Sequence, residues 1–93
     1  MIGIVATIKV QEGKGTAFEA IANQLVEKVT ANEEGVLHYD LYKQDDTTYV
    51  FLERYKDQAA FDLHQKTEYY KAAGAQLGAV LAGAPDIKVL KSV

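Results

Sequence analysis

Two side chains suited to acid–base chemistry stand in the stretch FLERYKDQAAFDLHQ, Phe51 to Gln65. Glu53 interrupts an apolar and aromatic strand pattern, and burial among such neighbours raises the pKa of a carboxyl group, whereas a charged partner lowers it again. Such a carboxylate can orient a histidine, accept a proton from a substrate hydroxyl or act as a base. The same pattern is also typical of a structural hydrogen bond, or of an ion pair to Arg54 or a lysine of a second copy.

His64 follows Phe61 by three residues and Ala60 by four, so helical spacing places it on the same inward face. Imidazole is the side chain most readily tuned for proton transfer near neutral pH. A core histidine bonded to a backbone carbonyl is the structural alternative. His38 lies in a strand pattern, where surface and interface positions are the ordinary interpretation.

The composition excludes several classes of protein. Ninety-three residues form one domain, residues 1–93, and a net charge of −3 with interspersed signs argues against a nucleic-acid binder. The absence of cysteine excludes disulfides, thiolate catalysis and cysteine-bound metals. Neither histidine belongs to a metal-binding spacing, so no metal is expected. No signal peptide or membrane-spanning run is apparent, which favours the cytoplasm and no membrane partner.

The first half of the chain predicts a strand, a helix and a turn. Residues 2–10 alternate as a β-branched strand, and Thr16 with Glu19 predicts a capping box at a helix start. Gly35 in NEEG suits the chain reversal after the helix, and we expect ANEEG to be a solvated turn. Helical spacing relates six apolar residues: Phe18, Ile21, Ala22, Leu25, Val26 and Val29.

The second half predicts a hairpin, two helices and a last strand. Residues 36–43 and 48–55 flank the polar turn QDDT, and Asp57 is the expected N-cap of a short helix that ends at His64 or Gln65. A further helix is expected from Thr67 to about Leu81, and residues 86–93 form a strand after the single proline. The fold class is therefore α+β, a ferredoxin-like β-α-β-β-α-β domain whose four-stranded antiparallel sheet carries its helices on one face.

The hairpin, closed around the two aspartates of the turn, pairs Tyr39 with Leu52 and Glu53 with His38. In this register one face is mostly aliphatic and suits the core. The other face collects aromatic and ionisable side chains: Val36, His38, Asp40, Tyr42, Tyr49, Phe51, Glu53 and Tyr55. Such a face is typical of a dimer interface and also of a small-molecule pocket. A one-residue slip of the register exchanges the two faces.

Several motifs resemble the antibiotic-biosynthesis-monooxygenase-like family of small dimeric α+β barrels. The similar segments are EEGVLHYDLY and YVFLERYKDQAAFDLHQKTEYY, together with VQEGKGTAFEAI near the start. The matching positions are Glu34, Gly35, Tyr39, Glu53, Tyr55, Ala60-Phe61 and His64. Haem-degrading relatives have tryptophan in place of Tyr55 and histidine in place of Gly74, so the resemblance speaks against haem degradation.

The resemblance implies a homodimer with a pocket between sheet and helices in each protomer. It implies oxidation of phenols or hydroquinones by O₂ without metal, haem or flavin cofactor, because a deprotonated phenol can give an electron to O₂. Glu53 and His64 would then be the catalytic acid–base or orienting pair. The expected substrate-binding residues, in part from the strand pattern and in part from the resemblance, are His38, Tyr39, Phe51, Tyr55 and Tyr69.

Our leading hypothesis is therefore a cofactor-independent monooxygenase that acts on a small aromatic substrate. A second hypothesis on the same dimeric scaffold is a non-oxidative isomerase or a binding protein for a small aromatic or carbonyl metabolite. A third is a purely structural dimer in which tyrosines fill the cavity.

Overall fold

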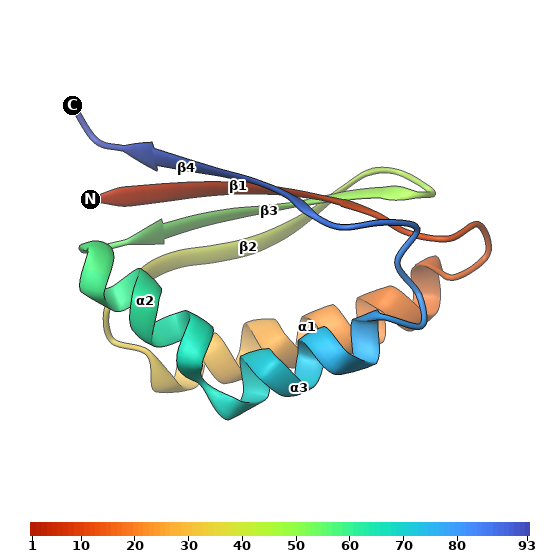
Figure 1. Cartoon of the computed structure of the whole chain (residues 1–93), viewed down its shortest axis with the longest axis horizontal. Coiled ribbons are helices and arrows are strands. Elements are labelled where there is room, and N and C mark those ends of the chain that lie inside the picture. The colour runs from red at the N-terminus through yellow and green to blue at the C-terminus, as the bar shows by residue number, and fades with distance from the viewer.

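The computed structural model describes residues 1–93 and has a four-stranded sheet with three helices on one face (Figure 1). The elements in chain order are β1 (Ile2–Lys9), α1 (Gly15–Asn32), β2 (Val36–Asp45), β3 (Thr48–Tyr55), α2 (Gln58–Lys66), α3 (Glu68–Leu77) and β4 (Asp86–Lys91). The strand order is β2-β3-β1-β4, and every neighbouring pair is antiparallel. The predicted ferredoxin-like fold is confirmed, with the second helical segment divided into α2 and α3.

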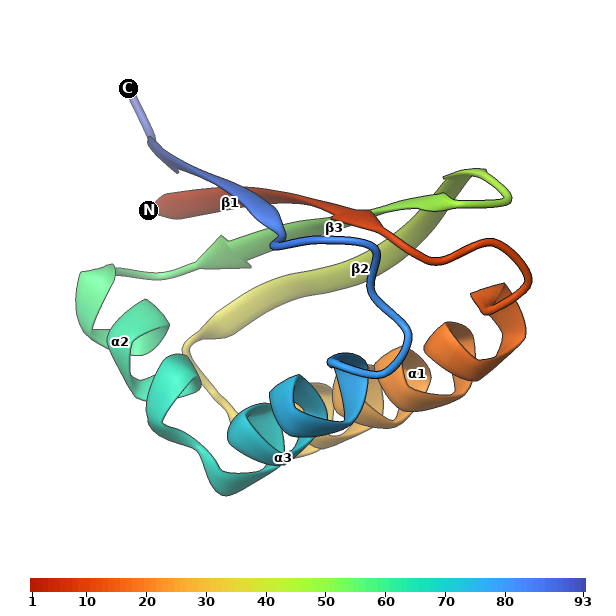
Figure 2. The ribbon, with the colours of Figure 1, turned by 45° about the vertical axis from the view of Figure 1, so that its right-hand side comes forward.

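The core lies between the sheet and the helices. Strand β1 alternates as predicted, and every second side chain from Ile2 to Ile8 is buried against the helices. The inward stripe of α1 meets it with four buried residues: Phe18, Ala22, Leu25 and Val29. Figure 2 shows the helices side by side beneath the sheet, with the segment after α3 rising to β4. None of the three helices is long and apolar enough to span a membrane.

Two of the three helix starts agree with ordinary capping. The Asp57 carboxylate accepts a hydrogen bond of 2.9 Å from the Ala60 N–H and caps α2 as predicted. Thr67 caps α3 in the same way. The predicted capping box of α1 is wrong, because no side chain caps that helix start. The Glu19 carboxylate instead accepts a hydrogen bond from the Tyr49 hydroxyl on β3, which draws it toward the sheet.

The predicted register of the β2–β3 hairpin is wrong by one residue. Tyr39 pairs with Glu53 rather than with Leu52, and an irregularity between Lys43 and Asp45 sets the new phase. A bulge of this kind adds one unpaired residue to a strand, and the periodicity of the sequence does not reveal it.

The corrected register reverses the predicted faces of β3. Its helix-facing side chains are Tyr49, Phe51, Glu53 and Tyr55, and they share that face with Tyr39 and Leu41 of β2. The prediction that Glu53 lies opposite His38 on the face away from the core is therefore wrong. Glu53 points toward the helices, on the same side of the sheet as His64.

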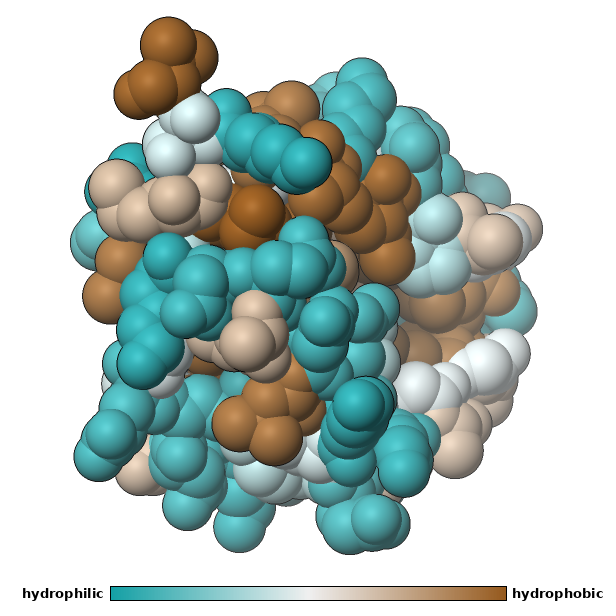
Figure 3. Space-filling model, turned by 60° about the vertical axis from the view of Figure 1, so that its left-hand side comes forward, coloured by the Kyte–Doolittle hydropathy of each residue, from teal (hydrophilic) through white to brown (hydrophobic).

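The outer face of the sheet retains exposed apolar side chains. Tyr42 is 54% exposed, Leu52 42% and Leu90 53%. The registers place them on the face that also carries His38 and Arg54. Figure 3 shows the end of the molecule near the termini, where brown apolar atoms emerge between teal polar ones. No helix covers the outer face of the sheet (Figure 1).

Gly35 joins α1 to β2 at a close approach between backbone and helix. A Cβ atom at this position would lie 2.5 Å from the Cβ of Ala60 on α2, well inside van der Waals contact. The Gly35 carbonyl also accepts a hydrogen bond from the Lys56 N–H. Steric contact with Ala60 thus leaves room only for glycine at position 35, and α2 packs directly on the end of the α1–β2 connection.

Candidate active site

A cavity of about 290 Å³ lies between the sheet and the helices. Its walls are mostly apolar and come from β1, α1, β3, α2, α3 and β4: Ile4, Ala6, Ile8, Leu25, Phe51, Phe61, Ala73, Leu77, Leu81 and Ile87. The ionisable lining residues are Tyr39, Glu53, His64, Tyr70 and Lys71, with Gln65 as a further polar one. An apolar cavity with a few convergent polar groups is the usual form of a small-molecule site.

Glu53 reaches this cavity from the inward face of β3. The Tyr55 hydroxyl donates a hydrogen bond of 2.6 Å to its Oε1 atom, and Tyr39 lies beside it across the strand pair. Burial raises the pKa of Glu53 to about 7, against the lowering effect of the Tyr55 hydrogen bond and with a small contribution from Glu33. A carboxyl group with a pKa near neutrality can both take up and release a proton at pH 7, which suits a general base.

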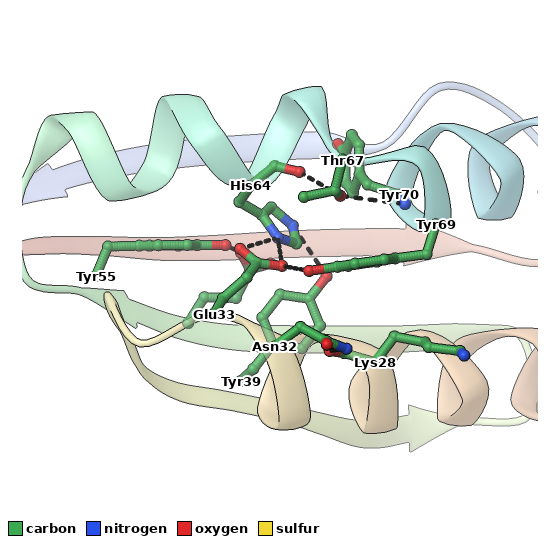
Figure 4. Close-up of polar contacts among 10 residues, drawn as sticks. Lys28, Asn32, Glu33, Tyr39, Tyr55, His64, Thr67, Tyr69 and Tyr70 are labelled. Carbon is green, nitrogen blue, oxygen red and sulfur yellow. Dashed lines mark hydrogen bonds and ion pairs between the residues drawn. The ribbon is translucent and has the colours of Figure 1, made fainter.

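His64 projects from α2 into the same region and is 1% exposed (Figure 4). Its Nδ1 atom lies 3.1 Å from both carboxylate oxygens of Glu33, and its Nε2 atom lies 3.4 Å from the Tyr39 hydroxyl oxygen. The rings of Tyr39, Tyr55 and Tyr70 pack around the imidazole. Burial lowers the pKa of His64, although the Glu33 carboxylate partly opposes this shift, so the neutral imidazole is favoured.

Glu33 is the residue of this candidate site that the sequence interpretation missed. Its side chain is 5% exposed, and it accepts hydrogen bonds from His64 and from the Tyr69 hydroxyl (Figure 4). The expectation that ANEEG is a solvated turn is therefore wrong for Glu33, although the adjacent Glu34 is exposed. The C-terminal end of α1 directs Glu33 inward, four residues after the buried Val29, where it meets His64 of α2.

The structure brings most of the predicted site residues together, in different roles. Tyr39 and Phe51 line the cavity, whereas Tyr55 lies behind Glu53 and Tyr69 bonds Glu33 outside the cavity lining. Glu53 and His64 both line the cavity, but each is hydrogen-bonded to a different partner.

His38 lies apart from this group. It is on the outer face of the sheet, with 59% of its side chain exposed and its Nδ1 atom 4.0 Å from Asp40. Tyr70, which was not among the predicted site residues, also lines the cavity.

The tyrosines around the cavity remain protonated at neutral pH. Burial raises the pKa of Tyr39 and of Tyr55 far above 10, with the charge of Glu53 as the next cause. Burial and the hydrogen bond to Glu33 raise the pKa of Tyr69 to about 12. Their hydroxyls therefore act as hydrogen-bond donors to the two carboxylates and to His64. No three His, Asp or Glu side chains converge in the geometry of a metal site.

Comparison with known families gives a match over most of the chain. The family model described as antibiotic biosynthesis monooxygenase matches residues 1–76. A curated Bacillus subtilis (strain 168) protein named "Putative monooxygenase YcnE" is 38% identical over 87 residues, which cover 91% of this chain and 90% of that protein.

Solved structures agree with this match. A crystal structure described as a putative antibiotic biosynthesis monooxygenase from Caulobacter crescentus CB15 is 45% identical, with a TM-score of 0.95 over 99% of this chain and 89% of that chain. Rv0793 from Mycobacterium tuberculosis is 27% identical, with a TM-score of 0.89 over 99% of this chain and 94% of that chain.

Proposed function

The chain belongs to the antibiotic biosynthesis monooxygenase family, and on this premise we propose that it is a cofactor-independent monooxygenase that oxidises a phenol or hydroquinone to a quinone with O₂. The observation that carries the proposal is Glu53. It is a carboxyl group whose pKa is about 7, at the wall of an apolar cavity large enough for a small aromatic molecule.

The first step is proton abstraction by Glu53. The carboxylate takes the phenolic proton of a substrate whose ring lies against Phe51 and the aliphatic walls. A phenolate is a far better electron donor than a phenol, so its reaction with O₂ becomes feasible in a site that excludes water. The Tyr55 hydroxyl holds the carboxylate in place, and stabilises its charged form before the substrate enters.

The oxidation needs no external reductant. With a phenol, one oxygen atom of O₂ enters the ring as the new carbonyl oxygen, and the other leaves as water with two hydrogens from the substrate. With a hydroquinone, two electrons and two protons pass to O₂, which leaves as hydrogen peroxide. The Tyr70 hydroxyl lines the cavity and is the tyrosine donor available beside a developing oxyanion.

The same proposal includes a homodimer formed through the outer face of the sheet. Tyr42, Leu52 and Leu90 are about half exposed on this face, and their burial against a second sheet would remove an apolar surface from water. His38 and Arg54 on the same face would then be interface residues. Sedimentation equilibrium tests this point, and a Leu52→Arg variant that stays as dimeric as the wild type would contradict it.

Oxygen consumption with a panel of phenols and hydroquinones tests the activity. We expect uptake by the wild type, loss in Glu53→Gln and strong reduction in His64→Ala. His38→Ala is the matched control, because this histidine lies outside the cavity. The peroxide yield separates the two reactions described above. Turnover that continues without O₂ would favour an isomerase, and binding without turnover would favour a binding protein.

A further inference from the structure

The hydroxyl donors of Tyr39 and Tyr55 at the polar end of the cavity are used in hydrogen bonds within the protein. We propose that the polar end of the cavity selects molecules that donate a hydrogen bond, so that it binds an aromatic hydroxyl compound in preference to the matching ether, ketone or quinone. This inference rests on the proposed function for its choice of aromatic ligands. It adds that the site binds the reduced, hydroxyl-bearing form of such a ligand more tightly than the oxidised form.

Glu33 determines which groups donate in these hydrogen bonds, because an ionised carboxylate accepts hydrogen bonds and cannot donate them. The Tyr69 hydroxyl donates to Glu33, and the Nδ1 atom of His64 lies 3.1 Å from both of its oxygens. A bare Nδ1 atom would place two acceptors against each other in a buried position, so Nδ1 carries the proton. In the neutral imidazole, Nε2 is then an acceptor.

This tautomer of His64 also determines whether the Tyr39 hydroxyl donates or accepts. The Nε2 atom lies 3.4 Å from the Tyr39 hydroxyl oxygen, and since Nε2 has no proton, Tyr39 is the donor. Next to Tyr39 across the strand pair, Glu53 accepts a hydrogen bond at Oε1 from the Tyr55 hydroxyl. Both hydroxyl protons are therefore committed within the protein. What remains for a ligand is the lone pairs of the Tyr39 oxygen and the free oxygen of Glu53.

The other polar groups of the lining do not reverse this preference. The Tyr70 hydroxyl can donate or accept, and it serves either kind of ligand equally. Gln65 and Lys71 belong to exposed positions of the lining. A hydroxyl placed at Glu53 donates to the free oxygen of the carboxylate, whereas a carbonyl or an ether there leaves that desolvated oxygen without a donor. Such unmatched buried groups are costly, so we expect a preference of about tenfold or more.

The preference has a consequence for turnover. A hydroquinone presents donors, and the quinone that it becomes presents only acceptors. The oxidised product therefore loses its best contacts at Glu53 and Tyr39 when the reaction is complete, and release is favoured without a conformational change.

Acidification weakens the preference, because protonated Glu53 becomes a donor itself. Its pKa is about 7, raised mainly by burial, and the ionisable groups around it are Tyr39, Tyr55, Tyr70, His64 and Lys71, with Glu33 contributing at longer range. Burial lowers the pKa of His64 and so favours its neutral ring. The tyrosines stay neutral over this range, so Glu53 dominates the change. Selectivity for a hydroxyl is thus largest above pH 7 and declines below it.

Calorimetric titration without O₂ tests the proposal on three probes: 2-naphthol, 2-methoxynaphthalene and naphthalene. At pH 8 we expect the wild type to bind 2-naphthol about tenfold more tightly than either other probe, with a smaller ratio at pH 6. Glu53→Gln, which replaces an acceptor by an amide donor, should lose most of the ratio. Equal binding of 2-naphthol and naphthalene, or no binding of any probe, would overturn the proposal.

Nitrogen-15 spectroscopy tests the hydrogen-bond direction without any ligand. The chain has two histidines, and the exposed His38 serves as the internal reference for His64. We expect the His64 signals of a neutral ring protonated at Nδ1, and a change of tautomer populations in Glu33→Gln. Protonation at Nε2 in the wild type would contradict the argument. The proposed oxidation is tested separately. If the protein consumes no O₂, the oxidation is refuted, whereas the calorimetric and nitrogen-15 measurements can still support the hydrogen-bond preference.

Discussion

Removal of the Glu33 carboxylate should destabilise the fold far more than its place in a polar turn suggests. Glu33→Ala leaves two donors without their acceptor, the Nδ1–H of His64 and the hydroxyl of Tyr69. Because His64 is 1% exposed, water cannot replace the lost partner without opening the packing of α2. The variant thus tests whether one carboxylate joins the end of α1 to both α2 and α3.

The magnitude follows from the exposure of each donor. An unpaired buried donor destabilises a fold by about 1–3 kcal/mol, and the fully buried Nδ1–H of His64 should cost an amount in this range. Tyr69 is partly exposed, so its hydroxyl can turn to water at a cost of about 1 kcal/mol. We therefore expect a loss of about 2–4 kcal/mol for Glu33→Ala, and about half of that for Glu33→Gln, whose amide oxygen still accepts one bond.

Urea denaturation at pH 7.5 measures the free energy of unfolding, with circular dichroism as the signal. Glu34→Ala is the matched control, since the neighbouring carboxylate is exposed and its loss should change stability by less than about 0.5 kcal/mol. At constant m-value, the midpoint should fall clearly for Glu33→Ala alone. Equal stabilities of the two variants would refute the argument that Glu33 is a structural acceptor for His64.

Four further variants test separate parts of the structure. Burial raises the pKa of Glu53 from 4.5 to about 7, so the native state binds more protons than the unfolded state between these pH values, and the stability of the wild type falls as pH rises through them. The stability of Glu53→Gln relative to the wild type should therefore rise by about 1–3 kcal/mol between pH 5 and pH 8 in parallel urea titrations. A difference that stays constant with pH would contradict this. Gly35→Ala should lose about 1–3 kcal/mol through the contact with Ala60, whereas Gly74→Ala, with open space around its Cβ, should gain about 0.5–1 kcal/mol in thermal melts. Asp57→Ala should lose about 1 kcal/mol with its N-cap bond, and an unchanged melting temperature would contradict that role.

The element order could be read from the sequence because each element carries a local signal. The alternation of β1, the apolar spacing of α1 and the Asp57 cap are properties of short segments, and all three occur as predicted. The register of the hairpin is not such a property. An irregularity between Lys43 and Asp45 shifts the register of β3 against β2 by one residue, and no residue type in the turn predicts it.

The site was predictable only in part for the same reason. Helical spacing placed His64 on an inward face, and this is where the structure has it. The acceptor for His64 lies 31 positions earlier in the chain, at a helix end whose neighbouring glutamate is exposed. Composition cannot distinguish Glu33 from Glu34, but helical spacing can, because Glu33 follows the buried Val29 by four residues and its N–H donates a hydrogen bond to the Val29 carbonyl.

The distribution of tyrosines makes the protein its own optical probe. The chain has no tryptophan and six tyrosines, and Tyr39, Tyr55, Tyr69 and Tyr70 surround the two carboxylates and His64. Ultraviolet emission therefore originates largely from phenol rings within reach of the cavity. An aromatic guest that enters it should alter this emission directly, so occupancy can be followed in the unmodified protein without a label.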